Sequence, residues 1–113
     1  MRIHKGDIVR HFKRETLTLE QLEDNINLYL YRVLDFARHT ETGELLVIYE
    51  ALYSGCDVCC GDKFARPFDM FMGKVDHEKY PNIKSNYRFE IMTYADIGND
   101  VHKIEEAKIR RSE

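Results

Sequence analysis

Two apolar segments joined by a short glycine-containing turn constrain the fold of this chain more than any other feature. Residues 28–39 are rich in Leu, Tyr, Val and Phe, residues 45–53 have a similar composition, and Thr40-Glu41-Thr42-Gly43-Glu44 lies between them. Gly43 can adopt the left-handed conformation that closes a hairpin loop of this length. The pattern therefore predicts a β-hairpin.

Both faces of this hairpin carry apolar side chains. In the second arm they alternate, with Leu45, Val47, Tyr49, Ala51 and Tyr53 on one face and Leu46, Ile48 and Leu52 on the other. Strands that are buried on two sides are either central strands of a sheet or strands curled into a barrel.

The remaining segments give shorter elements. We predict a strand over Gly6–Phe12 after a turn at Gly6-Asp7, a strand over Lys63–Arg66, one helical turn starting at Pro67, and a closing strand over Tyr87–Met92. Thr18 and Gln21 fit a capping box, which predicts a short helix near Leu19–Asp24 in the first connection. We interpret residues 76–86 as a loop with a helical turn.

The C-terminal residues differ in character from the rest. Ile97, Val101 and Ile104 have helical spacing and Asp100 is a suitable cap, so residues 100–113 predict a helix, with a frayed, charged end as the alternative. We therefore divide the chain into a barrel domain, residues 1–93, and a C-terminal tail, residues 94–113.

Five short strands, tight turns and little helix favour a mostly β fold. A small SH3-like barrel with a short helix in the first connection is the architecture that we expect, and an open α+β sheet is the alternative.

The charge balance limits the class of partner. The net charge is −3 and the sequence pI is about 6.0, whereas a general nucleic-acid-binding domain is usually strongly basic. One basic cluster near the N-terminus is opposed only by Asp7, and it comprises Arg2, Lys5, Arg10, Lys13 and Arg14. A solvated face is the common reason for such a cluster. A nucleic-acid-binding accessory domain using this strand remains an alternative.

Targeting signals are missing from the sequence. No apolar segment follows the first residues as in a signal peptide, and no segment has the roughly 20 apolar residues of a membrane span. The odd number of cysteines, 3, fits poorly with a disulfide framework. We therefore expect a cytoplasmic protein that does not contact a membrane.

Several short sequence blocks follow one another in a fixed order along the chain. They are Arg10-His11-Phe12-Lys13, Tyr31-Arg32-Val33-Leu34, Ala37-Arg38-His39-Thr40-Glu41-Thr42, Leu46-Val47-Ile48-Tyr49, Ala51-Leu52-Tyr53-Ser54-Gly55, Ala65-Arg66-Pro67 and Met70-Phe71. Over about residues 6–75 the chain resembles the bacterial family called domain of unknown function 1653. The resemblance implies an SH3-like barrel and no established activity. Residues 14–27 lengthen the first connection, and residues 56–60 lie outside the family pattern.

The cysteine segment is a weak candidate for a metal site. Cys56, Cys59 and Cys60 contain one C-x-x-C, but a structural zinc ion needs four ligands, so a histidine would have to complete the set. Loop thiols without such a role are the more frequent case. A small metal-binding or redox protein is therefore only an alternative, and we predict no cofactor.

No catalytic motif stands out. Phosphate-binding loops, H-E-x-x-H, G-x-S-x-G and dinucleotide fingerprints are all absent from the sequence. His11, His39 and Glu41 could form an acid–base group, but Glu41 also suits a hairpin turn. We expect no catalytic residue and favour a protein that is not an enzyme.

These considerations lead to a binding module as the predicted function. Its ligand would be a peptide, a protein or a small anion; nucleic acid is less favoured. The residues that we predict to contact it are His11, Arg38, His39, Tyr49, Tyr53 and Arg66. Arg66 either pairs with a carboxylate, such as Asp69 or Glu50, or faces the ligand. The tyrosines are shared between this surface and ordinary core packing.

Overall fold

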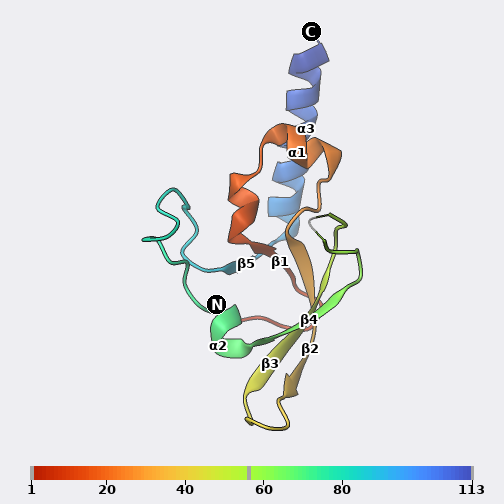
Figure 1. Cartoon of the computed structure of the whole chain (residues 1–113). Coiled ribbons are helices and arrows are strands. Elements are labelled where there is room, and N and C mark those ends of the chain that lie inside the picture. The colour runs from red at the N-terminus through yellow and green to blue at the C-terminus, as the bar shows by residue number, and fades with distance from the viewer. Residues whose placement is uncertain (1, 56, 113) are drawn as a thin grey trace.

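The computed structural model describes residues 2–55 and 57–112. The elements in chain order are strand β1 (Ile8–His11), the 3₁₀ helix η1 (Phe12–Thr16), helix α1 (Leu19–Asp24), strands β2 (Leu30–Arg38), β3 (Leu45–Ala51) and β4 (Lys63–Pro67), helix α2 (Phe68–Phe71), strand β5 (Phe89–Ile91) and helix α3 (Tyr94–Ser112) (Figure 1).

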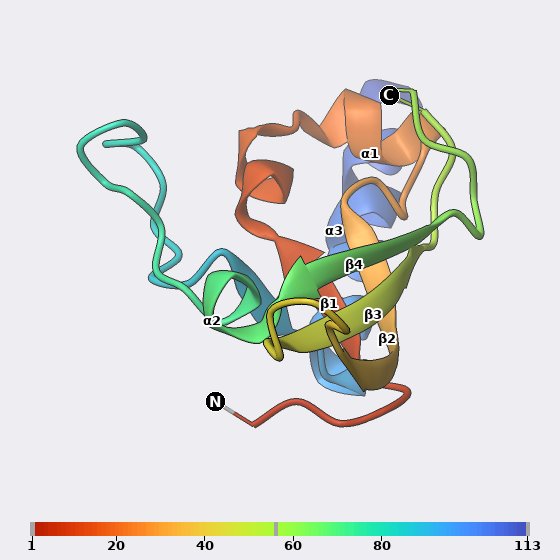
Figure 2. The same cartoon turned by 60° about the horizontal axis from the view of Figure 1, so that its bottom comes forward.

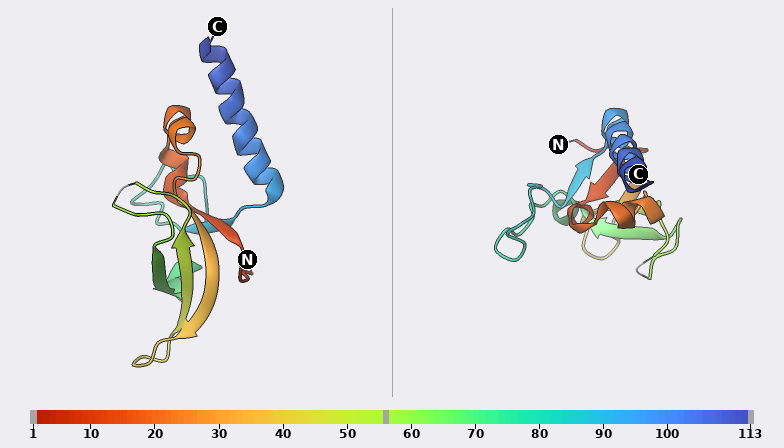
Figure 3. Two further views of the ribbon diagram at one scale, coloured as in Figure 1. Left: turned by 90° about the vertical axis from the view of Figure 1, so that its right-hand side faces the viewer. Right: turned by 90° about the horizontal axis from the view of Figure 1, so that it is seen from above.

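The strands form one antiparallel sheet in the order β4-β3-β2-β1-β5. The β2–β3 pair is its longest ladder, and its register shifts between Val33 and Asp35. Such an irregularity increases the local twist and bends the strand. Figure 3 shows β2 and β3 curving along their length.

The predicted hairpin is confirmed. Gly43 has a φ of 75°, and its N–H donates to the carbonyl of His39 over 2.9 Å. The N–H of His39 in turn donates to the carbonyl of Glu44 over 2.8 Å. The left-handed glycine therefore allows the chain to reverse within the loop.

The two edges of the sheet meet through side chains. No ladder joins β4 to β5 among the described residues, but α2 follows β4 directly (Figure 2). Helix α2 carries Phe71, whose ring contacts the Phe89 ring of β5. The two rings stack with centroids 4.2 Å apart and an interplanar angle of 4°, and their exposures are 0% and 1%. This contact makes the curved sheet barrel-like, and the predicted mostly β class with five strands is confirmed.

The interior of the sheet is rich in aromatic side chains. Tyr31 and Tyr53 are buried, and their hydroxyls share a hydrogen bond of 2.7 Å. Burial and this hydrogen bond raise the pKa of the Tyr31 phenol. The two hydroxyl groups therefore meet their need for a hydrogen bond within the core instead of through water.

The first connection follows the sequence signal closely. Helix α1 spans the predicted residues, the Gln21 N–H donates to Thr18 Oγ1 over 3.1 Å, and the Thr18 N–H donates to Gln21 Oε1 over 2.9 Å. The predicted capping box is confirmed.

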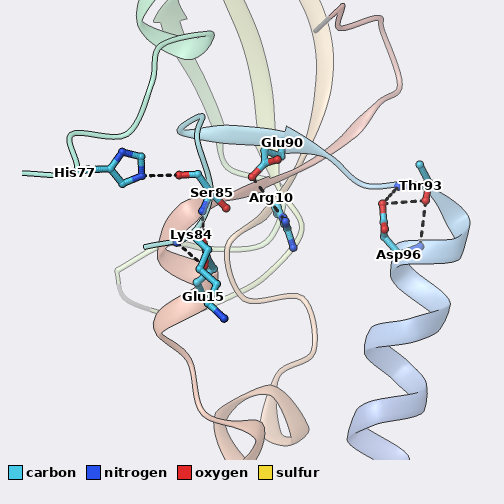
Figure 4. Close-up of polar contacts among 8 residues, drawn as sticks. All are labelled: Arg10, Glu15, His77, Lys84, Ser85, Glu90, Thr93 and Asp96. Carbon is cyan, nitrogen blue, oxygen red and sulfur yellow. Dashed lines mark hydrogen bonds and ion pairs between the residues drawn. The ribbon is translucent and has the colours of Figure 1, made fainter. Parts of the chain in front are cut away.

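Helix α3 begins earlier than predicted. It starts at Tyr94, and Thr93 and Asp96 form the hydrogen bonds of a second capping box: the Asp96 N–H donates to Thr93 Oγ1 over 3.1 Å and the Thr93 N–H donates to Asp96 Oδ2 over 2.9 Å (Figure 4). The prediction that Asp100 caps the helix is wrong, because Asp100 lies inside it.

Arg14 connects α3 to the rest of the molecule. Its side chain is buried, donates to the carbonyls of Ile26 and Leu28 over 2.8 and 2.7 Å, and lies 3.2 Å from the carboxylate of Asp100. Ile104, one turn after Asp100, is buried on the same face of the helix. The C-terminal end of α3 extends past the sheet (Figure 3). Within the described residues, no helix has the length and apolar character needed to cross a bilayer.

The stack between Phe71 and Phe89 gives a first test. We expect Phe71→Ala to lower the free energy of unfolding by about 3–5 kcal/mol, because it opens a cavity between the two edges of the sheet. Met70→Ala is the matched control, since Met70 is 50% exposed on the same helix and its truncation should change stability by less than about 0.5 kcal/mol. Urea denaturation of both variants measures the difference; equal effects would contradict this account of closure.

Candidate functional site

One cavity brings together positive side chains from distant parts of the chain. It has a volume of about 300 Å³ and lies between β1, η1, β4 and the connection of residues 72–88. We call it the basic pocket. Its lining residues are His11, Phe12, Lys13, Arg66, Asp76, Lys79, Tyr80 and Arg88.

Arg66 reaches this pocket from the inward-facing side of β4. Its guanidinium carbon lies 5.4 Å from the centroid of the Phe89 ring, an arrangement that favours a cation–π contact. Burial raises the pKa of the Tyr49 phenol, and the neighbouring Arg66 guanidinium opposes that rise. The Arg66 guanidinium therefore packs against the aromatic core where the two edges of the sheet meet.

The expected pairing of Arg66 with a carboxylate is not present. Among the described residues no carboxylate lies within 4.0 Å of its guanidinium, and Glu50 is instead 3.7 Å from Arg32. The reason is the alternation of β4, which turns Arg66 toward the interior with Phe64, whereas exposed Asp69 lies on α2.

His11 forms a wall of the basic pocket. Its ring contacts Phe12 and Phe89 with centroid separations of 4.4 and 5.0 Å, and its Nδ1 accepts the N–H of Lys13 over 3.1 Å. Burial, followed by the charges of Arg66, Lys13 and Arg88, lowers the pKa of His11 to about 4. The imidazole is therefore neutral at pH 7, with its proton on Nε2.

The 72–88 connection supplies three further lining residues, Lys79, Tyr80 and Arg88. The Tyr80 ring packs edge-on against Phe12 with centroids 4.9 Å apart, and Lys79 Nζ lies 5.5 Å from the Tyr80 centroid. The backbone carbonyl of Arg88 accepts the N–H of Phe12 over 2.9 Å. These contacts place the connection against η1.

Glu15 holds the same connection from the other side. Its two carboxylate oxygens accept the backbone N–H groups of Lys84 and Ser85 over 3.0 and 2.9 Å, and the carbonyl of Ser85 lies 3.0 Å from His77 Nε2 (Figure 4). The hydrogen bonds from Ser85 and Lys84 lower the pKa of the Glu15 carboxyl, against the opposing effect of burial. The lining residues are thus carried on an anchored loop.

The other predicted ligand-binding residues lie elsewhere. Tyr49 and Tyr53 are core residues with exposures of 5% and 3%, because they occupy inward-facing positions. Arg38 and His39 lie at the tip of the β2–β3 hairpin and bond within it: Arg38 donates to the carbonyl of Gly43 over 2.7 Å, and His39 Nδ1 accepts the N–H of Glu41 over 3.1 Å. The structure brings only His11 and Arg66 of the predicted set to the pocket.

The basic cluster near the N-terminus is dispersed in the fold. Lys5 pairs with Asp35 over 3.0 Å, and Arg10 lies 3.7 Å from Glu90 (Figure 4). Arg14 is buried against Asp100, and Lys13 alone of these residues lines the basic pocket.

The cysteine segment gives no support for a metal site. Cys59 and Cys60 are exposed free thiols, and among the described residues there is no group of three or more His, Cys, Asp or Glu that could hold a metal ion. Cys56 lies outside the described residues.

The sequence analysis does not identify Lys79, Tyr80 and Arg88 as site residues: the first two fall in the segment interpreted as a loop with a helical turn, residues 76–86, and Arg88 falls in the predicted closing strand. That turn exists: Asp76 Oδ1 accepts the N–H of Glu78 over 3.1 Å. The available signal was the adjacent cation and aromatic ring of Lys79-Tyr80, together with Arg88 beside a buried phenylalanine. Neither the Lys79-Tyr80 pair nor the position of Arg88 beside Phe89 indicates on its own that these side chains line a common cavity.

The lowered pKa of His11 predicts a pH dependence of stability. The unfolded chain takes up the proton near the ordinary pKa of 6.5 and the folded chain only near 4, so the free energy of unfolding should fall as the pH drops from 6.5 toward 4. His11→Asn retains an acceptor for the Lys13 N–H and should show a shallower fall. Urea denaturation across this range compares the two slopes; identical slopes would refute the assignment.

Comparison with known proteins places the chain in a family without assigning a function. No curated protein and no solved structure matches it. A family model described as "Protein of unknown function (DUF1653)" matches residues 7–91, a range that includes every strand that the structure describes and all the lining residues of the basic pocket. The chain therefore belongs to the DUF1653 family.

Proposed function

We propose that the chain is a non-enzymatic binding module whose ligand is a small anion held in the basic pocket. One observation carries the proposal: Lys13, Arg66, Lys79 and Arg88 line a single cavity together with one carboxylate, that of Asp76. The lining has a formal charge of +3 at pH 7, because His11 is neutral there.

The way in which these cations are placed supports a ligand role. Like charges around one cavity repel each other, and field lines concentrate in a cleft with low-dielectric walls. None of the four makes an ion pair within 4.0 Å in the part of the chain that the structure describes. A bound anion would offset this repulsion.

The chemistry of the lining favours binding over catalysis. Its residues include no Ser, Thr or Cys that could serve as a nucleophile. A general base at neutral pH works best with a pKa near 7, whereas the pKa of His11 is about 4 and its Nδ1 already accepts a backbone hydrogen bond.

His11 offers a direct readout of anion binding. An anion beside Arg66, Lys13 and Arg88 would reduce their effect on the imidazole, so we expect sulfate to raise the His11 midpoint above about 4 in an NMR titration. Sodium chloride at the same ionic strength is the control, because screening alone acts equally in both salts. A midpoint that is the same in sulfate and chloride would count against the pocket.

Substitutions then test which cations bind the anion. Arg66→Gln and Arg88→Gln should each weaken binding of inorganic phosphate at pH 7 about tenfold or more, since each removes a charge-assisted hydrogen bond. Lys63→Gln and Lys84→Gln are matched controls, because these exposed lysines lie on the same strand and the same connection without lining the pocket. Chemical-shift titrations give the affinities. Equal losses in all four variants would show a diffuse charge effect and refute the site.

A further inference from the structure

We infer that the anion is the phosphate of a nucleoside monophosphate, with its base stacked on Tyr80. This inference rests on the proposed anion-binding function and specifies its ligand. Three features of the basic pocket carry it: its charge, the geometry of its donors and its aromatic wall.

The charge favours a phosphate monoester over a carboxylate. The lining has four cations and one carboxylate, and the Asp76 carboxylate already accepts the N–H groups of Glu78 and Lys79 over 3.1 and 3.4 Å. A singly charged carboxylate ligand would leave most of the positive charge of the lining uncompensated. A phosphate monoester is close to doubly charged at pH 7, so it would compensate more of that charge.

The donors also suit phosphate. Arg66 and Arg88 present planar guanidinium groups, which bind phosphate oxygens in pairs, and Lys13 and Lys79 add point charges from η1 and the 72–88 connection. The Arg66 guanidinium packs over the Phe89 ring, with its carbon 5.4 Å from the ring centroid. The four groups come from three separate segments, which converge on one cavity.

Tyr80 supplies a surface for a planar group beside these cations. Its ring is half-buried and packs against the Phe12 ring in a T-shaped arrangement, with centroids 4.9 Å apart and an interplanar angle of 62°. Lys79 Nζ lies over one face of the Tyr80 ring, 5.5 Å from its centroid, and a stacked base would displace this exposed side chain from that face. Bases stack on aromatic side chains beside cationic groups in proteins that bind single-stranded nucleic acids, and we infer the same contact for one nucleotide here.

The extent of the positive surface favours a single nucleotide over a polymer. The cavity of about 300 Å³ is at the lower end of the range for small-molecule sites. Beyond it, Arg10 is paired with Glu90 and Arg14 is buried against Asp100, and the whole chain has a net charge of −3. A polynucleotide would need a basic groove that continues along its backbone.

Calorimetric titration of the full chain with adenosine 5′-monophosphate, inorganic phosphate and a single-stranded adenine oligonucleotide tests the inference. We expect the monophosphate to bind about fivefold or more tightly than inorganic phosphate, the gain that stacking of one base provides. Tyr80→Leu should remove this gain and leave phosphate affinity unchanged, and Tyr80→Phe should retain it. Amide spectra confirm that both variants are folded.

The outcomes separate the two levels of the proposal. If inorganic phosphate binds and the monophosphate binds no more tightly, or Tyr80→Leu retains the gain, the nucleotide inference is wrong and the anion-binding function stands. If neither phosphate nor the monophosphate binds, both are wrong. If the oligonucleotide binds far more tightly than the monophosphate, with a steep salt dependence, the ligand is a polymer and the inference is also wrong.

Discussion

The contact between Phe71 and Phe89 determines how this molecule closes and where its pocket lies. It joins α2, which follows one edge of the sheet, to the strand at the other edge, with ring centroids 4.2 Å apart. Phe89 also supports Arg66 and contacts the ring of His11. Because the same ring closes the sheet and supports two lining residues, the shape of the basic pocket depends on the packing of the core.

The distribution of charge separates this pocket from the rest of the surface. Some cations outside the pocket are paired with carboxylates, as Lys5 is with Asp35 and Arg32 with Glu50. Exposed pairs of this kind add little stability, but they neutralise charge locally. In the pocket the cations share the lining with His11, whose pKa is lowered to about 4 first by burial and then by the charges of Arg66, Lys13 and Arg88. The proposed anion-binding function rests on this local excess of positive charge within a chain of net charge −3.

Most of the fold could be predicted because its signals are local. The Gly43 turn, the Thr18 capping box and the helical turn after Pro67 each depend on neighbouring residues, and all three are present. The pocket depends on long-range contacts instead. Glu15 holds the backbone of residues 84 and 85, 69 and 70 positions away, and that contact anchors the connection carrying Lys79, Tyr80 and Arg88. Such a contact leaves no periodic pattern in the sequence. His11 and Arg66 are therefore the only lining residues of the basic pocket that the sequence analysis predicts as ligand-binding residues.

A crystal structure of the protein grown with tungstate, an electron-dense analogue of phosphate, tests the central claim most directly. The account predicts one strong peak inside the basic pocket, within hydrogen-bond distance of the guanidinium groups of Arg66 and Arg88. An empty pocket under these conditions, or tungstate bound only to exposed cations such as Lys63, would contradict it.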